Sequence, residues 1–316
     1  MEKRKFFDLH CDTLTNCYDW KKPAQDTLND DKKVISLNHL PMDSNYAQLF
    51  AIFVPDDLRG GEAVEYFLNN AENFKRQTEK FSHKLKACRS SSGIEEAFGE
   101  NKMAAILSIE GGAAFGGELK NIEKAAQLGV RACTLTWNGE NEIASGNVTT
   151  HGLSQFGKKA IRCMEENSII VDVSHLNDVG FYDVLRVAKK PIIATHSNSR
   201  KISPHLRNLT DEEIKEIISM GGLIGLNFYI EFLNADKEKA NLMDLFHHAE
   251  HILELGGENV LAMGSDFDGC QVFEDLNSME KAVNLGDFFV SQGIPKEIAN
   301  KILFDNAFNF FKENVK

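Results

Sequence analysis

The sequence lacks the marks of secreted, membrane-spanning and disulfide-bonded proteins. Its six cysteines are scattered and include no CxxC pair, which is typical of reduced thiols in a cytoplasm. The chain begins Met-Glu-Lys-Arg-Lys and has neither the apolar stretch nor the cleavage site of a signal peptide. No apolar run approaches the length of a transmembrane helix. We therefore expect a cytoplasmic protein that has no membrane partner.

Positive charge is also scarce. The 35 Lys and Arg residues are outnumbered by 47 Asp and Glu residues, which gives a formal net charge of −12. No basic cluster is dense enough to override this charge, so the chain repels phosphate backbones and nucleic acid is excluded as a partner. The sequence has no low-complexity linker. With 316 residues and 42% hydrophobic content, it is long enough to bury a large core.

The chain does contain a sustained alternation of short β-rich runs and amphipathic helical segments. Eight runs have strand character, near residues 5–9, 46–54, 104–109, 131–136, 169–174, 191–195, 222–228 and 260–265. Helical patterns lie between them, at 62–80, 119–128, 153–167, 176–188, 210–220 and 241–255, and a terminal helix covers 299–316. Near-continuous apolar strands are typical of parallel sheets that are covered on both faces. The alternation predicts an α/β fold, a single (β/α)8 TIM barrel catalytic domain over residues 1–316, with segment 20–45 as a loop after the first strand.

Residue types that bind metal ions recur at the ends of these predicted strands. Because side chains alternate faces along a strand, His10 and Asp12 are expected to point the same way at the end of the first strand. Other predicted strands end in Glu110, His175, His196 and Asp266. Imidazole nitrogens and carboxylate oxygens are ligands of zinc and related divalent ions. Since the active site of such a barrel lies at the C-terminal ends of its strands, we expect these residues to converge on a metal site.

Each of these residues also has a purely structural interpretation. His10 and Asp12 could be a hydrogen-bonded pair that closes one end of the barrel, and Glu110 could cap the helix after its strand. His175 could equally cap a helix, and His196 could donate to a loop carbonyl. The repeated placement at strand ends favours metal binding over these separate explanations.

Two further patterns do not match a known metal motif. The turn Asp266-Phe267-Asp268-Gly269 resembles the start of a calcium loop but lacks the other EF-hand ligands, which leaves Asp268 as a turn or supporting residue. His247, His248 and His251 lie on a predicted helix without the zincin pattern. We interpret this helix as solvated or as an interface, because barrel helices lie outside the strands that form the site.

An ordered set of motifs resembles one enzyme family. The motifs, in chain order, are His10-x-Asp12, Ser108-Ile-Glu110-Gly-Gly, Val171-Asp-Val-Ser-His175, Thr195-His196-Ser-Asn-Ser-Arg, Arg207-Asn and Gly264-Ser-Asp266-Phe-Asp-Gly. They resemble the membrane dipeptidase (renal dipeptidase) family of zinc peptidases within the amidohydrolase superfamily. The resemblance extends from the first strand to the final helix, and it implies a metal-dependent hydrolase barrel with two zinc ions.

The resemblance also implies residue roles. His10 and Asp12 would hold one zinc ion, His175 and His196 the other, and Glu110 would bridge both. Arg207 would bind the terminal carboxylate of the substrate, Asp266 would be the acid/base at the eighth strand, and Tyr229 would contact the substrate.

One position departs from the family pattern. Vertebrate members have a histidine after the Thr-Leu-Thr of the fourth strand, whereas this chain has Trp137 followed by Asn138. Either Asn138 takes over a hydrogen bond to the substrate, or the pocket has a different shape.

Together these features predict a zinc-dependent dipeptidase. Its substrates would be dipeptides with a free C-terminal carboxylate, including ones with a C-terminal D-residue, and a hydroxide that bridges two zinc ions would be the nucleophile. Two alternatives stay open: another amidohydrolase-type reaction, such as N-acyl amino acid deacylation or lactone opening, and a metal-binding barrel without catalysis. A homodimer is compatible with the sequence.

Overall fold

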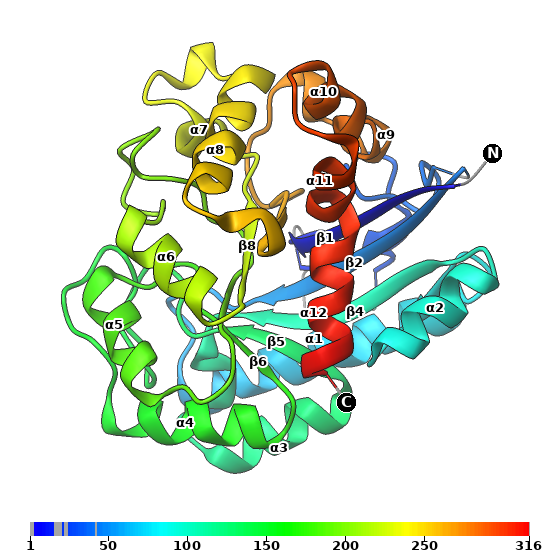
Figure 1. Cartoon of the computed structure of the whole chain (residues 1–316). Helices are drawn as coiled ribbons and strands as arrows, with labels where there is room; N and C mark the ends of the chain where they lie inside the picture. The colour runs from blue at the N-terminus through cyan, green and yellow to red at the C-terminus, as the bar shows by residue number, and fades with distance from the viewer. Residues whose placement is uncertain (1–2, 16–20, 22–24, 42, 316) are drawn as a thin grey trace.

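The structure is a computed structural model that describes residues 3–15, 21, 25–41 and 43–315. In this part of the chain, eight parallel strands form a closed barrel surrounded by helices (Figure 1). The barrel strands are β1 (Arg4–Cys11), β2 (Ser44–Phe53), β4 (Met103–Glu110), β5 (Val130–Thr134), β6 (Ile170–Asp172), β7 (Ile193–Ala194), β8 (Leu223–Leu226) and β9 (Leu261–Met263). The predicted α/β TIM-like barrel is confirmed.

The barrel closes through pairs of strands that are neighbours in space. Strand β1 pairs with β2 on one side and with β9 on the other, and β2 pairs with β4. One short strand that the sequence patterns do not predict, β3 (Leu85–Ala87), pairs with the first residues of β4 outside this ring. Three residues are too few to give a periodic hydrophobic signal.

The helices predicted between the strands are all present. They are α1 (Gly60–Lys80), α3 (Leu119–Leu128), α4 (Gln155–Glu166), α5 (Asp178–Val187), α6 (Asp211–Ser219) and α8 (Leu242–Glu254). The predicted terminal helix consists of α11 (Lys296–Asn300), a π-helical turn (Lys301–Asp305) and α12 (Asn306–Asn314). The described residues also form four short α-helices that were not predicted: α2 (Ser91–Gly99), α7 (Ile230–Leu233), α9 (Met279–Val283) and α10 (Leu285–Ser291).

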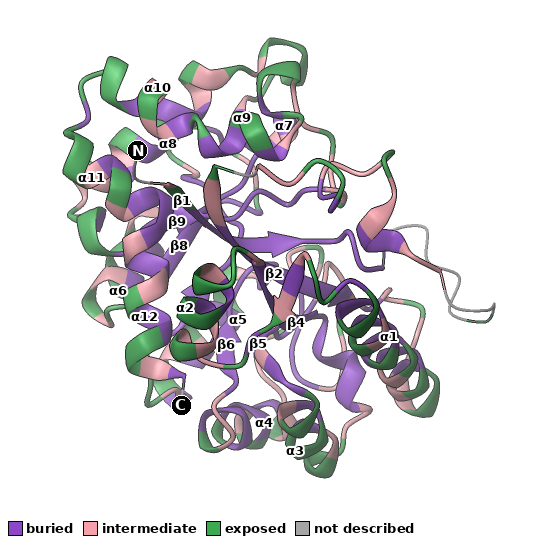
Figure 2. Cartoon of the chain, turned by 90° about the vertical axis from the view of Figure 1, so that its right-hand side faces the viewer, coloured by how far each residue is buried: buried purple, intermediate pink, exposed green. Residues whose placement is uncertain are grey.

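The hydrophobic core has an inner and an outer part. The inner cluster contains residues from all eight barrel strands and from α12. The rings of Phe7 and Phe311 lie 5.1 Å apart, so α12 covers the N-terminal end of the barrel. The outer cluster fills the space between the strands and the surrounding helices. Figure 2 shows the result: the strands are buried, and the helices expose their outer faces. The opposite, C-terminal end of the barrel therefore remains for a site.

A register shift in β1 decides which side chains face that end. Phe7 and Leu9 belong to the inner cluster, so strict alternation would turn Cys11 inward as well. The pairing of β1 with β2 shifts between Asp8 and Cys11, and Cys11 belongs to the outer cluster. An extra residue of this kind reverses the alternation that follows it.

Some of the residues discussed in the sequence analysis are not described by the structure. Cys17, Lys316 and residues 20, 22–24 and 42 of the predicted 20–45 loop lie outside the described residues. The described cysteines, Cys11, Cys88, Cys133, Cys163 and Cys270, are free thiols. Within the described residues, none of the helices has the length and apolar character needed to span a bilayer.

Candidate metal centre and active site

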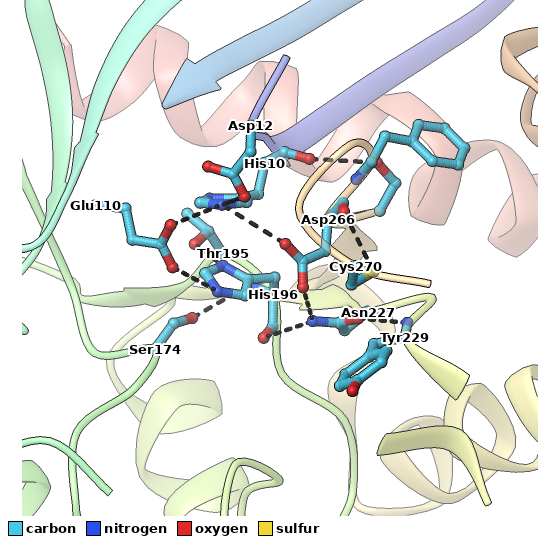
Figure 3. Close-up of polar contacts among 12 residues, drawn as sticks. His10, Asp12, Glu110, Ser174, Thr195, His196, Asn227, Tyr229, Asp266 and Cys270 are labelled. Carbon is cyan, nitrogen blue, oxygen red and sulfur yellow. Dashed lines mark hydrogen bonds and ion pairs between the residues drawn. The ribbon is translucent and has the colours of Figure 1, made fainter. Parts of the chain in front are cut away.

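The residues predicted to bind metal lie together at the C-terminal end of the barrel. Figure 3 shows all of them except His175. They come from five strands or the residues that follow them, and all are buried: His10 and Asp12 (β1), Glu110 (β4), His175 (after β6), His196 (after β7) and Asp266 (after β9). Among the described residues, the ligand atoms of His10, Glu110 and His196, and those of His10, Asp12 and Asp266, are close enough to share an ion.

His10 is surrounded by carboxylates. Its Nε2 atom lies 3.6 Å from Asp12 Oδ2, 3.6 Å from Glu110 Oε2 and 3.9 Å from Asp266 Oδ1. These distances are too long for hydrogen bonds, and Nε2 has no hydrogen-bond partner in the described part of the chain. Burial alone would lower the pKa of His10, but Glu110 and Asp12 outweigh it and raise that pKa well above its ordinary value.

His175 and His196 approach Glu110 from the other side. Nε2 of His175 lies 2.7 Å from Glu110 Oε1 and 2.9 Å from Nε2 of His196. Nδ1 of His175 lies 3.0 Å from Asn138 Oδ1, an atom that only accepts, so Nδ1 carries the ring proton. Nδ1 of His196 is 2.8 Å from the Thr195 hydroxyl. Burial, the largest cause, lowers the pKa of both histidines, that of His175 to about 4, so both rings are neutral.

This arrangement fits a pair of cations. A neutral imidazole whose Nδ1 bears the proton offers only a lone pair at Nε2. Three electron-rich atoms therefore lie within 3.5 Å of one another: Nε2 of His175, Nε2 of His196 and Oε1 of Glu110. His175 Nε2 carries no proton that could form a hydrogen bond to either of the other two. A divalent cation held by these three residues would remove this repulsion, because neutral imidazoles and carboxylates are metal ligands. Buried His and carboxylate groups on both sides of Glu110 are consistent with a binuclear metal site.

The carboxylates themselves respond to the crowding. Burial is the largest cause that raises the pKa of Asp12 and of Asp266 above the ordinary aspartate value, and the charge of Glu110 adds to it. Burial opposes ionisation of Glu110 too, but the charge of His10 lowers its pKa well below the ordinary value. Glu110 does not cap a helix, since the following 3-10 turn (Gly112–Phe115) has no side-chain cap.

Two of these residues have a strained backbone. His175 has φ +72° and Asp266 has φ +62°, and the neighbouring Asp268 has φ +65°. Non-glycine residues in this left-handed region cost about 1 kcal/mol or more each, and such strain is concentrated at functional sites. Asp268 is a supporting residue, as predicted: it accepts hydrogen bonds from the Thr13 hydroxyl at 2.5 Å and the Val34 backbone N–H at 2.8 Å.

Asp266 is held by a residue that the sequence analysis did not single out. Asn227 Nδ2 donates to Asp266 Oδ2 at 3.0 Å and lies 3.4 Å from the His196 carbonyl oxygen (Figure 3). Asn227 follows β8, so an inward polar residue at the end of a predicted strand was the signal that could have identified it.

Arg207 lies beside this centre as a buried cation. It is 5% exposed, and Nη2 donates to the His196 carbonyl oxygen at 3.3 Å. Its Nε is buried and has no hydrogen-bond partner among the described residues. The guanidinium carbon lies 5.3 Å above the Phe232 ring. Burial lowers the pKa of Arg207 to about 10, so the side chain remains charged at neutral pH.

One cavity of about 1180 Å³ joins Arg207 to the candidate metal centre. Tyr229 lines it beside Arg207, with its ring 4.8 Å from that of Phe232. Asn138 lines it near His175, to which its Oδ1 is bonded. Trp137 also faces the cavity and packs edge-on against Phe53, with ring centroids 4.9 Å apart. The position that departs from the family pattern is thus part of an aromatic wall.

The histidine cluster on α8 differs from its sequence interpretation at one residue. His247 is half exposed, and His251 contacts a carboxylate at the start of α6. His248 is fully buried, so the prediction of a solvated helix is wrong for it. Its Nδ1 accepts from the Ser199 backbone N–H at 3.1 Å, which leaves Nε2–H to donate to the Leu233 carbonyl at 3.0 Å. His248 is a core histidine with satisfied hydrogen bonds.

The chain is similar in sequence and in fold to known proteins. A curated relative, an uncharacterized protein in the pqqA 5' region of Klebsiella pneumoniae, is 28% identical over 263 residues, which cover 80% of this chain and 97% of that protein. The crystal structure of the dipeptidase AC, a metallo peptidase, has a TM-score of 0.91 at 24% identity and covers 99% of both chains. A metallo peptidase from Rhodobacter sphaeroides, liganded with a phosphinate mimic of the dipeptide L-Ala-D-Ala, has a TM-score of 0.91 at 23% identity over 99% of this chain and 100% of its own.

The structural matches show that the barrel fold is shared. The sequence itself matches a family model over its full length. The family described as membrane dipeptidase (peptidase family M19) matches residues 1–316. This chain therefore belongs to the membrane dipeptidase family, peptidase family M19.

Proposed function

We propose that this protein is a zinc-dependent dipeptidase that hydrolyses short substrates with a free C-terminal carboxylate. The observation that carries the proposal is the single cavity in which a buried arginine lies next to a buried His/carboxylate centre. A guanidinium offers a planar fork that matches a carboxylate, and Nε of Arg207 lacks a partner among the described residues. A substrate carboxylate would supply that partner.

In this proposal the metal ligands form two groups, one on each side of Glu110. His10 and Asp12 would hold one zinc ion, with Asp266 next to them, and His175 and His196 would hold the other. Glu110 would contact both ions, since its two oxygens face different histidines. Divalent cations bound here would lower the pKa of a water between them and polarise the substrate carbonyl.

The protein's own residues then have distinct roles. Arg207 binds the terminal carboxylate and so fixes the peptide bond relative to the barrel. Asp266 accepts a proton from the attacking water and delivers it to the departing amine, which is a poor leaving group without that proton. Asn227 holds Asp266 Oδ2 and leaves Oδ1 directed at the centre. Tyr229 and Asn138, which both line the cavity, contact the substrate.

The structural relatives support the substrate class. The Rhodobacter sphaeroides metallo peptidase was crystallised with a mimic of a dipeptide whose C-terminal residue is D-alanine. We infer that this chain also accepts dipeptides, including ones with a C-terminal D-residue.

One observation favours a second candidate. The aromatic wall of Phe53 and Trp137 gives the cavity an apolar side, which suits an acyl chain as well as an amino acid side chain. Deacylation of N-acyl amino acids would use the same arginine and the same centre, so this reaction is the alternative to dipeptide hydrolysis.

The test is a hydrolysis panel with metal analysis. Protein stripped with a chelator and reloaded with zinc should bind two ions per chain and cleave dipeptides, and the stripped protein should be inactive. The panel compares L,L- and L,D-dipeptides, the matching dipeptide amides and N-acyl amino acids. Cleavage of N-acyl amino acids but not of dipeptides would replace the proposal with the second candidate. Two bound ions without hydrolysis of any substrate would contradict both.

A further inference from the structure

A buried carboxylate lies behind the candidate metal centre, and the proposed reaction does not use it. Asp172, the last residue of β6, is 1% exposed. Its Oδ1 accepts from the backbone N–H of Ser174 at 2.9 Å and of Thr195 at 3.0 Å. Its Oδ2 accepts from the Thr134 hydroxyl at 2.8 Å and also from the Thr195 hydroxyl. All of these donors come from β5, β6 or β7 or from the residues just after them.

The Thr195 hydroxyl connects this carboxylate to a predicted metal ligand. It touches Asp172 Oδ2 on one side and lies 2.8 Å from His196 Nδ1 on the other. A hydroxyl has one proton to donate, and an ionised carboxylate can only accept. The Thr195 proton therefore points to Asp172, and the Thr195 oxygen must accept a proton from His196 Nδ1.

We propose that Asp172 and Thr195 act as positioning residues that fix the tautomer of His196. With the proton at Nδ1, Nε2 has a free lone pair directed at Glu110 Oε1, 3.5 Å away. The other tautomer would turn the Thr195 hydroxyl proton toward the ring and leave two oxygens facing each other at Asp172. The carboxylate thus selects the tautomer that binds a metal, one residue removed from the ligand itself.

The other histidine on the same side is oriented in a different way. His175 Nδ1 is bonded to Asn138, a neutral side chain that lines the cavity, whereas the group behind His196 is fully buried. Backbone contacts add to the support of His196, because its N–H lies 3.2 Å from the Ser174 hydroxyl oxygen. Loss of the Thr195 hydroxyl should therefore lower the affinity for the ion that His196 would bind and leave the affinity for the ion at His10 and Asp12 unchanged.

The ion-binding assay uses Thr195→Val, with Thr195→Ser as its matched control. Valine keeps the shape of threonine and the Thr195 backbone bond to Asp172 but has no hydroxyl, while serine keeps the hydroxyl. Zinc is titrated into apoprotein against a chromophoric chelator. We expect Thr195→Val to bind one of the two ions about 10- to 100-fold more weakly, the usual effect of losing such a supporting hydrogen bond. Thr195→Ser should bind both ions within a few-fold of the native protein.

A second variant and a metal-free measurement separate positioning from folding. Asp172→Asn should weaken the same single ion, and the melting temperature of each apoprotein shows whether the fold is kept. In 15N-histidine-labelled apoprotein, the His196 ring, assigned through its absence in His196→Asn, should carry its proton at Nδ1. A proton at Nε2 would overturn the inference without reference to any metal.

The inference rests on the proposed metal centre but can fail separately from the proposed function. If dipeptides are cleaved and Thr195→Val binds both ions as tightly as Thr195→Ser, the positioning role is refuted and the dipeptidase proposal stands. If Thr195→Val loses affinity for one ion while the native protein cleaves no dipeptide, the positioning role stands and the dipeptidase proposal fails.

Discussion

Replacing Arg207 by alanine tests the substrate class most directly. The guanidinium is 5% exposed and charged at neutral pH, and its only hydrogen bond recorded in the described structure is Nη2 to the His196 carbonyl. Under the proposed function, this charge would face the carboxylate of a bound substrate rather than solvent. Dipeptides with a free carboxylate should bind it, and dipeptide amides should not.

The size of the effect follows from burial. Loss of one partner of a buried, charge-assisted pair costs about 2–5 kcal/mol. A cost of about 2 kcal/mol corresponds to roughly 30-fold in kcat/KM, so Arg207→Ala should lower kcat/KM for free dipeptides by about 30-fold or more. Lysine keeps the positive charge but cannot form the two parallel hydrogen bonds of a guanidinium. The kcat/KM of Arg207→Lys should therefore lie between those of the native protein and Arg207→Ala.

The assay compares each dipeptide with its amide in the native protein and in the variants, with zinc content measured in parallel. Arg186→Ala is the matched control, because Arg186 lies on α5 with its side chain 67% exposed and should not affect either substrate. In Arg207→Ala the acid should become as poor a substrate as the amide. Equal rates for the acid and the amide in the native protein would refute the role of Arg207.

Four further predictions concern the centre, the cavity wall and the core. Glu110→Ala should reduce zinc from two ions per chain more than any other single substitution, since Glu110 faces both groups of ligands; unchanged metal content by elemental analysis would remove it as the bridge. Asp266→Asn should lower kcat by about 10²- to 10⁴-fold with both ions bound, whereas near-native turnover would exclude it as the acid/base and loss of an ion would make it a ligand. Trp137→Ala should lower kcat/KM by about 10-fold for dipeptides with a large N-terminal side chain and little for those with N-terminal glycine, because the ring forms an apolar wall; an equal loss on both would argue against that contact. Burial lowers the pKa of His248 to about 4 from 6.5, so the unfolded chain takes up the proton first and the free energy of unfolding falls as the pH drops through that interval. Between about pH 7 and about pH 5, the free energy of unfolding of His248→Gln should fall by about 2 kcal/mol less than that of the native protein, measured by urea unfolding of the two apoproteins. Equal decreases in the two proteins would contradict a buried neutral histidine at this position.

The barrel and the place of the site could be predicted from the sequence because both depend on repetition. Eight apolar runs separated by helical patterns leave few architectures other than a barrel. Once the barrel is given, a residue at the end of one strand is near the residues at the ends of the others. His10 and Glu110 are 100 positions apart in the chain, yet their ligand atoms lie 3.6 Å apart. No contact had to be predicted individually.

Local geometry could not be predicted in the same way. The shift in β1 between Asp8 and Cys11 is one residue long and has no hydrophobic signature, although it is what allows both Leu9 and His10 to face inward. Simple alternation placed His10 and Asp12 on one face correctly, but it missed that the faces change before His10. The burial of His248 was missed for a related reason, since one of its hydrogen-bond partners, Ser199, lies 49 positions away in the chain.

One peptide unit connects the parts of the proposed mechanism. The His196 ring faces the candidate metal centre, while its carbonyl oxygen accepts from Arg207 at 3.3 Å and lies 3.4 Å from Nδ2 of Asn227, which also holds Asp266. Arg207, the His196 ring and, through Asn227, Asp266 are therefore all held by the same peptide unit. Under the proposed function, a fixed separation between the bound carboxylate and the attacked carbonyl would select the peptide bond nearest the C-terminus, because only that bond would reach the centre.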